Sequence, residues 1–328
     1  MESKVKDLYG VWRIIMRVKE LVKPIILQRA DPWIYKHEDG YYYFTASVPE
    51  YDRIEIRRSK TINGLAEEEG VVVWRRHNEG MLSANIWAPE IHHIDGKWYI
   101  YFAAARTTET NDGLFDHRNF VLENESENPL EGEWIEKGQL KTNWESFSLD
   151  ATTFEHNGTR YLVWAQKDPN IYGNSNIYIA KMSNPWTIEG EQIMITEPEY
   201  DWEKIGFLVN EGPAVIKRNG KIFISYSASA TDYNYCIGFI MADENSNLLD
   251  KNSWKKSKNP ILKSDDEKEI YGPGHSSFTI SEDGESDILV YHARTYKEIV
   301  GDPLYDPNRH TFVKKIEYDS DGNIVFNR

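Results

Sequence analysis

The chain has 328 residues, of which 40% are hydrophobic, and its 53 acidic and 38 basic residues give a formal net charge of −15. This length and apolar content are sufficient for a sizeable buried core, and the acidic balance argues against binding to nucleic acid or to an anionic membrane surface. The single cysteine, Cys236, excludes an intrachain disulfide bond.

The first 25 residues differ in pattern from the rest of the chain. In VWRIIMRVKELV, apolar residues recur near helical spacing, so we predict an N-terminal arm or short helix over residues 1–25. The opening MESKVKDLYG has neither the apolar core nor the small-residue cleavage site of a signal peptide, and no run approaches the ~18 apolar residues that cross a bilayer. We therefore expect a cytoplasmic protein without a membrane partner.

From residue 26 onward, one pattern returns five times in chain order. Each copy reads as a short strand, a turn that carries glycine, and a second apolar strand. The copies are ADPWIYKHEDGYYYFTAS, APEIHHIDGKWYIYFAA, DATTFEHNGTRYLVWAQ, EGPAVIKRNGKIFISYSAS and HSSFTISEDGESDILVYHA. Their richness in Tyr, Trp, Ile, Val and Phe favours sheet, and self-similarity at this period indicates a propeller or a solenoid.

The second half of each repeat adds two more strands. Alternating segments follow in the order IEIRRS, FVLENE, IYIAKM, IGFIMA and FVKKIE, and turn-rich links then lead to segments such as VVVWRR and EWIEKG. Four antiparallel strands in each unit is the pattern of a propeller blade. We predict an all-β fold, a five-bladed β-propeller of four-stranded antiparallel blades, formed as one domain by residues 26–328.

One position of the repeat carries ionisable residues. Aligned on the turn glycines, the opening position of the five copies holds Asp31, Ala88, Asp150, Glu211 and His275. In a ring, one repeat position is one place, so three carboxylates and a histidine should meet at one mouth of the central channel. Carboxylates crowded together raise the pKa of at least one of them, and a neutral acid beside an ionised base is what glycoside hydrolysis requires.

The motifs around these residues resemble glycoside hydrolase family 43 along nearly the whole chain. The matching segments are RADPWIY, WAPEIH, LDATTF, NEGPAV and GPGHSSF. The resemblance implies an inverting mechanism in which Asp31 is the general base, Glu211 is the general acid, and Asp150 tunes the pKa of the acid and orients it. It also implies that His275 is the central histidine, which in many family members lies near a hydrated metal ion, often a structural calcium, while the chemistry itself requires no cofactor.

Four further residues are candidates for substrate binding. Arg294 in YHART matches an arginine that reaches the active site in the family, and Trp87 precedes the ring position by one residue and would form a wall of the sugar pocket. Phe44 and Gln166 lie near the channel by repeat position, although packing explains them equally well.

The resemblance favours an exo-acting α-L-arabinofuranosidase that releases terminal arabinofuranose from arabinan- or arabinoxylan-type oligosaccharides. The blade-two insertion ARTTETNDGLFDHRN would narrow the mouth into a pocket. A β-xylosidase is the alternative, so the expected partner is an arabinose- or xylose-containing oligosaccharide. A non-catalytic sugar-binding propeller is a second alternative, but it would carry a similar site in every blade, whereas the ring position here differs between blades. No oligomeric state is predicted.

Overall fold

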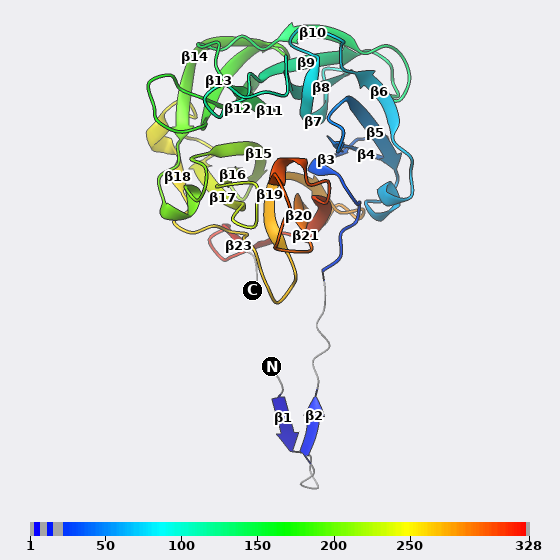
Figure 1. The fold of residues 1–328 in the computed structure, drawn as a ribbon, viewed down its shortest axis with the longest axis vertical. Helices are drawn as coiled ribbons and strands as arrows, with labels where there is room; N and C mark the ends of the chain where they lie inside the picture. The colour runs from blue at the N-terminus through cyan, green and yellow to red at the C-terminus, as the bar shows by residue number, and fades with distance from the viewer. Residues whose placement is uncertain (1–2, 7–11, 16–21, 326–328) are drawn as a thin grey trace.

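The computed structural model describes residues 3–6, 12–15 and 22–325, and five antiparallel sheets form a ring in it (Figure 1). Blade one consists of β3 (Ala30–Lys36), β4 (Tyr42–Ser47), β5 (Arg53–Ser59) and β6 (Val71–Arg75). Blade two consists of β7 (Ala84–Ile94), β8 (Lys97–Ala105), β9 (Arg118–Asn124) and β10 (Ile135–Gln139). Blade three consists of β11 (Ser148–His156), β12 (Thr159–Gln166), β13 (Asn176–Asn184) and β14 (Thr187–Thr196).

The two remaining blades complete the ring. Blade four consists of β15 (Asn210–Arg218), β16 (Lys221–Ala228), β17 (Cys236–Asp243) and β18 (Lys255–Lys256). Blade five has β19 (Tyr271–Ile280), β20 (Asp287–Arg294) and β21 (His310–Lys315), followed by a small pair, β22 (Glu317–Tyr318) and β23 (Ile324–Val325). The prediction of an all-β, five-bladed propeller is confirmed.

The fifth blade takes its outer edge from the other end of the chain. Ile26 forms an antiparallel bridge with Thr311 of β21, and the amide of Thr311 donates to the carbonyl of Ile26 at 2.8 Å. The start of the propeller therefore closes the ring on its last blade, which leaves that edge paired.

The described part of the N-terminal segment is not helical. β1 (Ser3–Lys6) and β2 (Trp12–Ile15) pair antiparallel, so the short helix, one of the two alternatives that we predicted for residues 1–25, does not occur at these residues. Residues 1–2, 7–11 and 16–21 of that prediction lie outside the described residues. In a short apolar run, residue spacing alone does not distinguish a helix from a strand. Over the described ranges, no helix has the length and apolar character needed to cross a bilayer.

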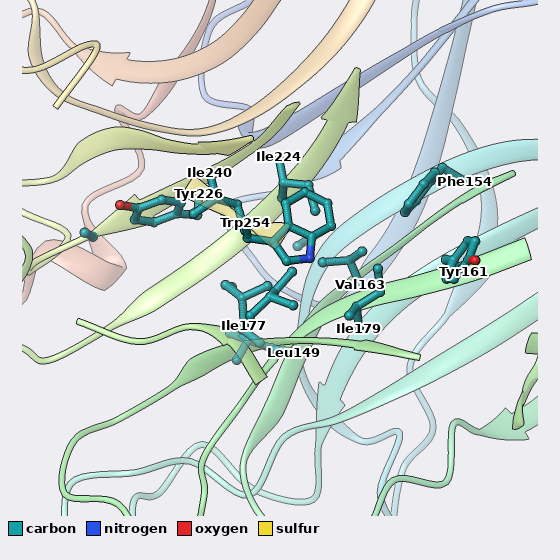
Figure 2. Packing of buried hydrophobic residues seen from close by; sticks show 14 of the residues in the cluster. Leu149, Phe154, Tyr161, Val163, Ile177, Ile179, Ile224, Tyr226, Ile240 and Trp254 are labelled. Atoms are coloured by element: carbon teal, nitrogen blue, oxygen red, sulfur yellow. The ribbon is translucent and has the colours of Figure 1, made fainter. Parts of the chain in front are cut away.

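The hydrophobic core lies between neighbouring blades. In the largest cluster, Val163 and Ile177 of blade three pack with Ile224 and Tyr226 of blade four, and Trp254 lies among them (Figure 2). Burying an aliphatic side chain of this size contributes ~1.5–3 kcal/mol. These contacts hold each blade against the next, so the first strands stay in fixed positions around the channel.

The first strand of every blade bulges at an equivalent place. The register shifts fall after Ala30, Trp87, Leu149, Glu211 and Gly274. The next residue in each strand has a positive φ: Asp31 at 53°, Ala88 at 47°, Asp150 at 56°, Gly212 at 55° and His275 at 43°. A bulge leaves an extra residue unpaired and re-aims the chain, so it presents these positions to the channel mouth.

This register corrects one position of the repeat. The residue of blade four that is equivalent to Asp31 and Asp150 is Gly212, and Glu211 precedes it by one residue, at the place of Trp87. Counting back from the turn glycines misplaced it because blades one and five have one more residue between the bulge and the glycine than the other three.

Candidate active site

A pocket of about 240 Å³ lies at the mouth of the channel where the bulges meet. Asp31, Asp150 and Glu211 all line it, together with His275. Asp31 belongs to blade one and Glu211 to blade four, and β19 of blade five contacts the first strand of both. The ring thus brings together carboxylates that are far apart in sequence and places Asp31 on the opposite side of blade five from Glu211.

Side chains from neighbouring blades bind the backbone amides of the bulges. The amide of Ala88 donates to Ser47 Oγ at 2.8 Å, and the amide of His275 donates to Ser227 Oγ at 2.6 Å. The amide of Gly212 donates to Asp150 Oδ2 at 2.9 Å. A positive φ costs a non-glycine residue ~1–2 kcal/mol, and these bonds hold the bulges in that conformation.

Asp31 is buried among positively charged and hydrogen-bonding groups. Its Oδ2 accepts a hydrogen bond from Ser47 at 2.5 Å, and its Oδ1 lies 3.6 Å from Arg309 Nη1 and 3.4 Å from His275 Nδ1. Burial alone would raise the pKa of Asp31, but the charges of His275 and Arg309 outweigh it and hold that pKa well below its usual range. Asp31 is therefore ionised at any working pH.

His292 fixes the backbone of Asp31 from blade five. Its Nδ1 accepts the Asp31 amide proton at 3.0 Å, so its own proton lies on Nε2. Burial lowers the pKa of His292 to about 3, which keeps the ring neutral in this role.

Asp150 and Glu211 form a coupled acidic pair. Burial, with the charges of Glu211 and Asp31, raises the pKa of Asp150 well above its usual range. Burial likewise raises the pKa of Glu211 to about 7, against a hydrogen bond that Tyr235 donates to Glu211 Oε1 at 2.7 Å. The pair therefore retains a proton near neutral pH. Glu211 is the most exposed of the three carboxylates and faces the pocket.

His275 does not belong to a metal-binding cluster in the described part of the chain. No group of three or more His, Cys, Asp or Glu residues there is arranged to hold a metal ion. Its Nδ1 faces Asp31 at 3.4 Å and Asp150 Oδ2 at 3.9 Å. An ion beside His275 would have to take its remaining ligands from water, so the protein does not supply a coordination shell.

The structure brings one of the four predicted substrate-binding residues to the pocket. Trp87 lines the wall, and its ring stacks on His117 with centroids 3.9 Å apart. Phe44 is buried in the core of blade one, and Gln166 is buried with its amide donating to Thr142, Trp144 and Ser146. Neither of them lines the pocket.

Arg294 also lies behind the pocket wall. It donates to the carbonyls of Thr231 and Pro303 at 2.9 and 2.6 Å and pairs with Asp306, so it holds the surrounding loops together. The arginine that reaches the pocket is Arg309, in the segment that leads into β21. Arg309 Nη2 donates to Tyr51 at 2.5 Å, which directs the guanidinium toward Asp31.

Sequence reasoning missed Arg309, Tyr235 and the two supports of Asp31, Ser47 and His292. Ser47 and His292 do have a detectable pattern, because both lie in the last three residues of a second strand, opposite the residue before a bulge. Arg309 and Tyr235 lie in the segments that link strands, and these segments have no equivalent positions in the other repeats. The blade-two insertion does reach the pocket, which Thr110, Gly113, Leu114 and Phe115 help to line.

Comparison with known proteins finds close relatives over most of the chain. The chain is 55% identical over 303 residues to the extracellular exo-α-(1→5)-L-arabinofuranosidase of Streptomyces avermitilis, and the match covers 92% of this chain and 62% of that protein. It is 53% identical over 294 residues to the enzyme of the same name from Streptomyces chartreusis, covering 90% of this chain and 88% of that one. The chain thus spans less than two thirds of the length of the first relative.

These relatives overturn the predicted location. Both are named as extracellular proteins, which contradicts the expectation of a cytoplasmic protein. The expectation failed because it rested on the pattern of the first residues alone.

A solved structure and a family model agree with the sequence relatives. The crystal structure of α-L-arabinofuranosidase from Lactobacillus brevis superposes with a TM-score of 0.92 at 54% identity, covering 95% of this chain and 98% of that one. The family model described as glycosyl hydrolases family 43 matches residues 22–324, which include every pocket residue described above. With its propeller, its three converging carboxylates and this match, the chain belongs to glycosyl hydrolases family 43.

Proposed function

We propose that this protein is an inverting exo-α-L-arabinofuranosidase that releases terminal arabinofuranose from arabinan- or arabinoxylan-type oligosaccharides. One observation carries the mechanism: two carboxylates of one pocket, on opposite sides of blade five, have environments that push their pKa values apart. Asp31 is held ionised, and Glu211 has a pKa raised to about 7. Such a pair is a base and an acid ready for glycoside hydrolysis.

In the proposed reaction, Glu211 gives its proton to the glycosidic oxygen as the bond between that oxygen and the anomeric carbon breaks. Asp31 takes a proton from a water molecule, whose oxygen bonds to the anomeric carbon from the opposite face. The products are a sugar of inverted configuration and a free alcohol, with no covalent intermediate and no cofactor. Inversion requires space for the water, which in such enzymes separates the carboxyl groups by ~6.5–9.5 Å.

Asp150 supports the acid in this proposal. Its Oδ2 holds the amide of Gly212, the residue next to Glu211, so it fixes the backbone that carries the acid. Its carboxyl group also shares a buried site with that of Glu211, and two like charges there oppose ionisation of the pair. These two contacts favour a protonated and oriented Glu211.

The shape of the pocket favours release of a single sugar. Ligand pockets commonly measure ~300–1,000 Å³, and this one, at about 240 Å³, is small. Its apolar lining includes Leu114 and Phe115 of the insertion, together with Phe207 and Leu304. Apolar walls around a few carboxylates suit a sugar ring, and a small pocket suits a chain end better than the middle of a polymer.

The names of the relatives favour arabinose over xylose, and turnover tests this directly. We expect a clear preference for aryl α-L-arabinofuranoside over aryl β-D-xyloside. From arabino-oligosaccharides, the early products should be arabinose and the same oligosaccharide shortened by one sugar, with no released fragment larger than a single sugar. Proton NMR of the first product should detect the inverted anomer. A preference for the xyloside would favour the β-xylosidase alternative, and binding without turnover would favour a non-catalytic sugar-binding propeller.

Two further points remain proposals. A structural calcium ion beside His275 would be held mainly through water, as suits a hard ion that prefers oxygen ligands. We also place the start of the catalytic domain at residue 26, after an N-terminal arm of residues 1–25. The pairing of Ile26 with Thr311 supports this boundary, because it makes that residue part of the closed ring.

A further inference from the structure

We propose that Tyr235 is the positioning residue of the general acid. Its hydroxyl donates a hydrogen bond to Oε1 of Glu211 and thereby leaves Oε2 to carry the proton that is transferred. This inference rests on the proposed function of Glu211. The Tyr235 hydroxyl donates to Glu211 Oε1 at 2.7 Å, and both residues line the pocket. A carboxylic acid has one proton, and the oxygen that accepts the phenol hydrogen bond is the less favourable place for it.

Two contacts hold the ring of Tyr235 in place. It stacks on His292 with centroids 5.6 Å apart and an interplanar angle of 5°. On another side it packs against the backbone of Gly274, where an added Cβ would lie 2.0 Å from the ring carbons Cδ1 and Cε1. The ring is almost completely buried, so its hydroxyl has little freedom to turn away from Glu211.

The same ring connects the two sides of the reaction. His292, on which it stacks, accepts the amide proton of Asp31. The acid and the base are thus held by groups that contact each other. Burial also raises the pKa of Tyr235 well above its usual range, so the phenol stays a neutral donor.

Removing the hydroxyl should change how Glu211 titrates. The ionisable groups that face Glu211 are Asp31, Asp150 and Arg309, besides Tyr235 itself, and His275 packs against the neighbouring Gly212. A hydrogen bond is stronger to an ionised acceptor than to a neutral one, so Tyr235 favours the carboxylate and lowers the pKa of Glu211. Without it the basic limb of the pH profile, where the acid loses its proton, should move up by about one pH unit.

The test compares Tyr235→Phe with the unmodified protein on two substrates. Phenylalanine keeps the ring that stacks on His292 and removes only the hydroxyl. We expect kcat for an arabino-oligosaccharide at pH 6 to fall about ten-fold, a part of the ~10²–10⁴ that general-acid catalysis contributes. We expect kcat for an activated aryl arabinofuranoside, whose leaving group needs little protonation, to change less than about three-fold. KM should change little for either substrate.

Tyr99→Phe is a matched control, because Tyr99 donates a 2.6 Å hydrogen bond to Glu123 in blade two, away from the pocket. It removes the same kind of bond, and we expect it to lower stability without moving the basic limb. Replacing Tyr235 with 3-fluorotyrosine keeps the fold and strengthens the donor, so the limb should move down in pH. Gly274→Ala should displace the ring through the added Cβ and move the limb up, as Tyr235→Phe does.

An unmoved basic limb in both Tyr235→Phe and the fluorotyrosine protein, or an equal loss on both substrates, would overturn the inference. Its failure is separable from failure of the proposed function. If Glu211→Gln still hydrolyses oligosaccharides, the role of Glu211 itself is refuted. If Glu211→Gln is inactive and Tyr235→Phe keeps the rate and pH profile of the unmodified protein, only the role of Tyr235 is refuted.

Discussion

Glu211→Gln should make the protein nearly inactive and, at alkaline pH, more stable. The side chain keeps its shape and an oxygen that can accept from Tyr235, but it has no proton to donate, so we expect the rate on oligosaccharides to fall by roughly 10²–10⁴. Burial raises the pKa of Glu211 from an ordinary 4.5 to about 7. A carboxyl group with a raised pKa contributes stability that is present below its unfolded pKa and is lost as pH rises through the folded value.

The size of this effect follows from the two pKa values. Each pKa unit corresponds to ~1.4 kcal/mol, so the buried Glu211 lowers the free energy of unfolding by at most roughly 3 kcal/mol between pH 4.5 and pH 8. A glutamine side chain is neutral at both of these pH values. We therefore expect Glu211→Gln to match the unmodified protein in stability at pH 4.5 and to exceed it by up to ~3 kcal/mol at pH 8.

Urea unfolding at the two pH values measures the stability difference, and hydrolysis of an arabino-oligosaccharide measures the activity. Tyr99→Phe serves as the comparison variant, because it removes a buried hydrogen bond while leaving Glu211 and the groups that shift its pKa in place. A stability gain that is the same at pH 4.5 and pH 8, or a loss at pH 8, would show that Glu211 is not held protonated by its surroundings. Near-normal activity on oligosaccharides would refute its role as the acid.

Three other predictions test the rest of the site. Asp31→Asn should reduce kcat by at least ~10²-fold on aryl glycosides and oligosaccharides alike, because the water must be activated whatever the leaving group; a loss confined to oligosaccharides would refute the role of Asp31 as base. Arg309→Met should raise the pKa of Asp31 and move the acidic limb of kcat/KM up by ~1–3 pH units. A carboxyl group whose pKa is lowered by folding stabilises the protein at pH values above its unfolded-state pKa, so the variant should also be less stable at neutral pH relative to acid pH. Arg294→Met is the matched control, for which we expect lower stability, from two lost backbone contacts, and an unmoved acidic limb. Chelation of divalent ions should lower Tm with little change in kcat at a temperature where the protein stays folded, and added calcium should restore Tm; an unchanged Tm after verified metal removal would exclude a structural ion beside His275.

The sequence alone determined the architecture and three of the pocket carboxylates. Blades are built from neighbouring hairpins, so strand pairing is local and the repeat is visible as a pattern of turn glycines and apolar strands. A closed ring then brings equivalent positions together, which is why Asp31 and Asp150 could be placed at one mouth without any structure, and Glu211 reaches the same mouth because it lies one residue before the equivalent position. The cellular location of the protein could not be inferred in this way, and the names of the relatives contradict the expectation of a cytoplasmic protein.

The finer arrangement of the site became visible only in the folded ring. The bulge register shows that Gly212, not Glu211, is equivalent to Asp31, and no feature of the strands marks a one-residue shift. The selection of Arg309 over Arg294 depends on where the loops of blade five lie against Tyr51 and Asp31. Closure by Ile26 and the hold of His292 on Asp31 join residues more than 250 positions apart. Such contacts depend on the direction and packing of each side chain in the assembled ring, and residue spacing along the chain does not encode them.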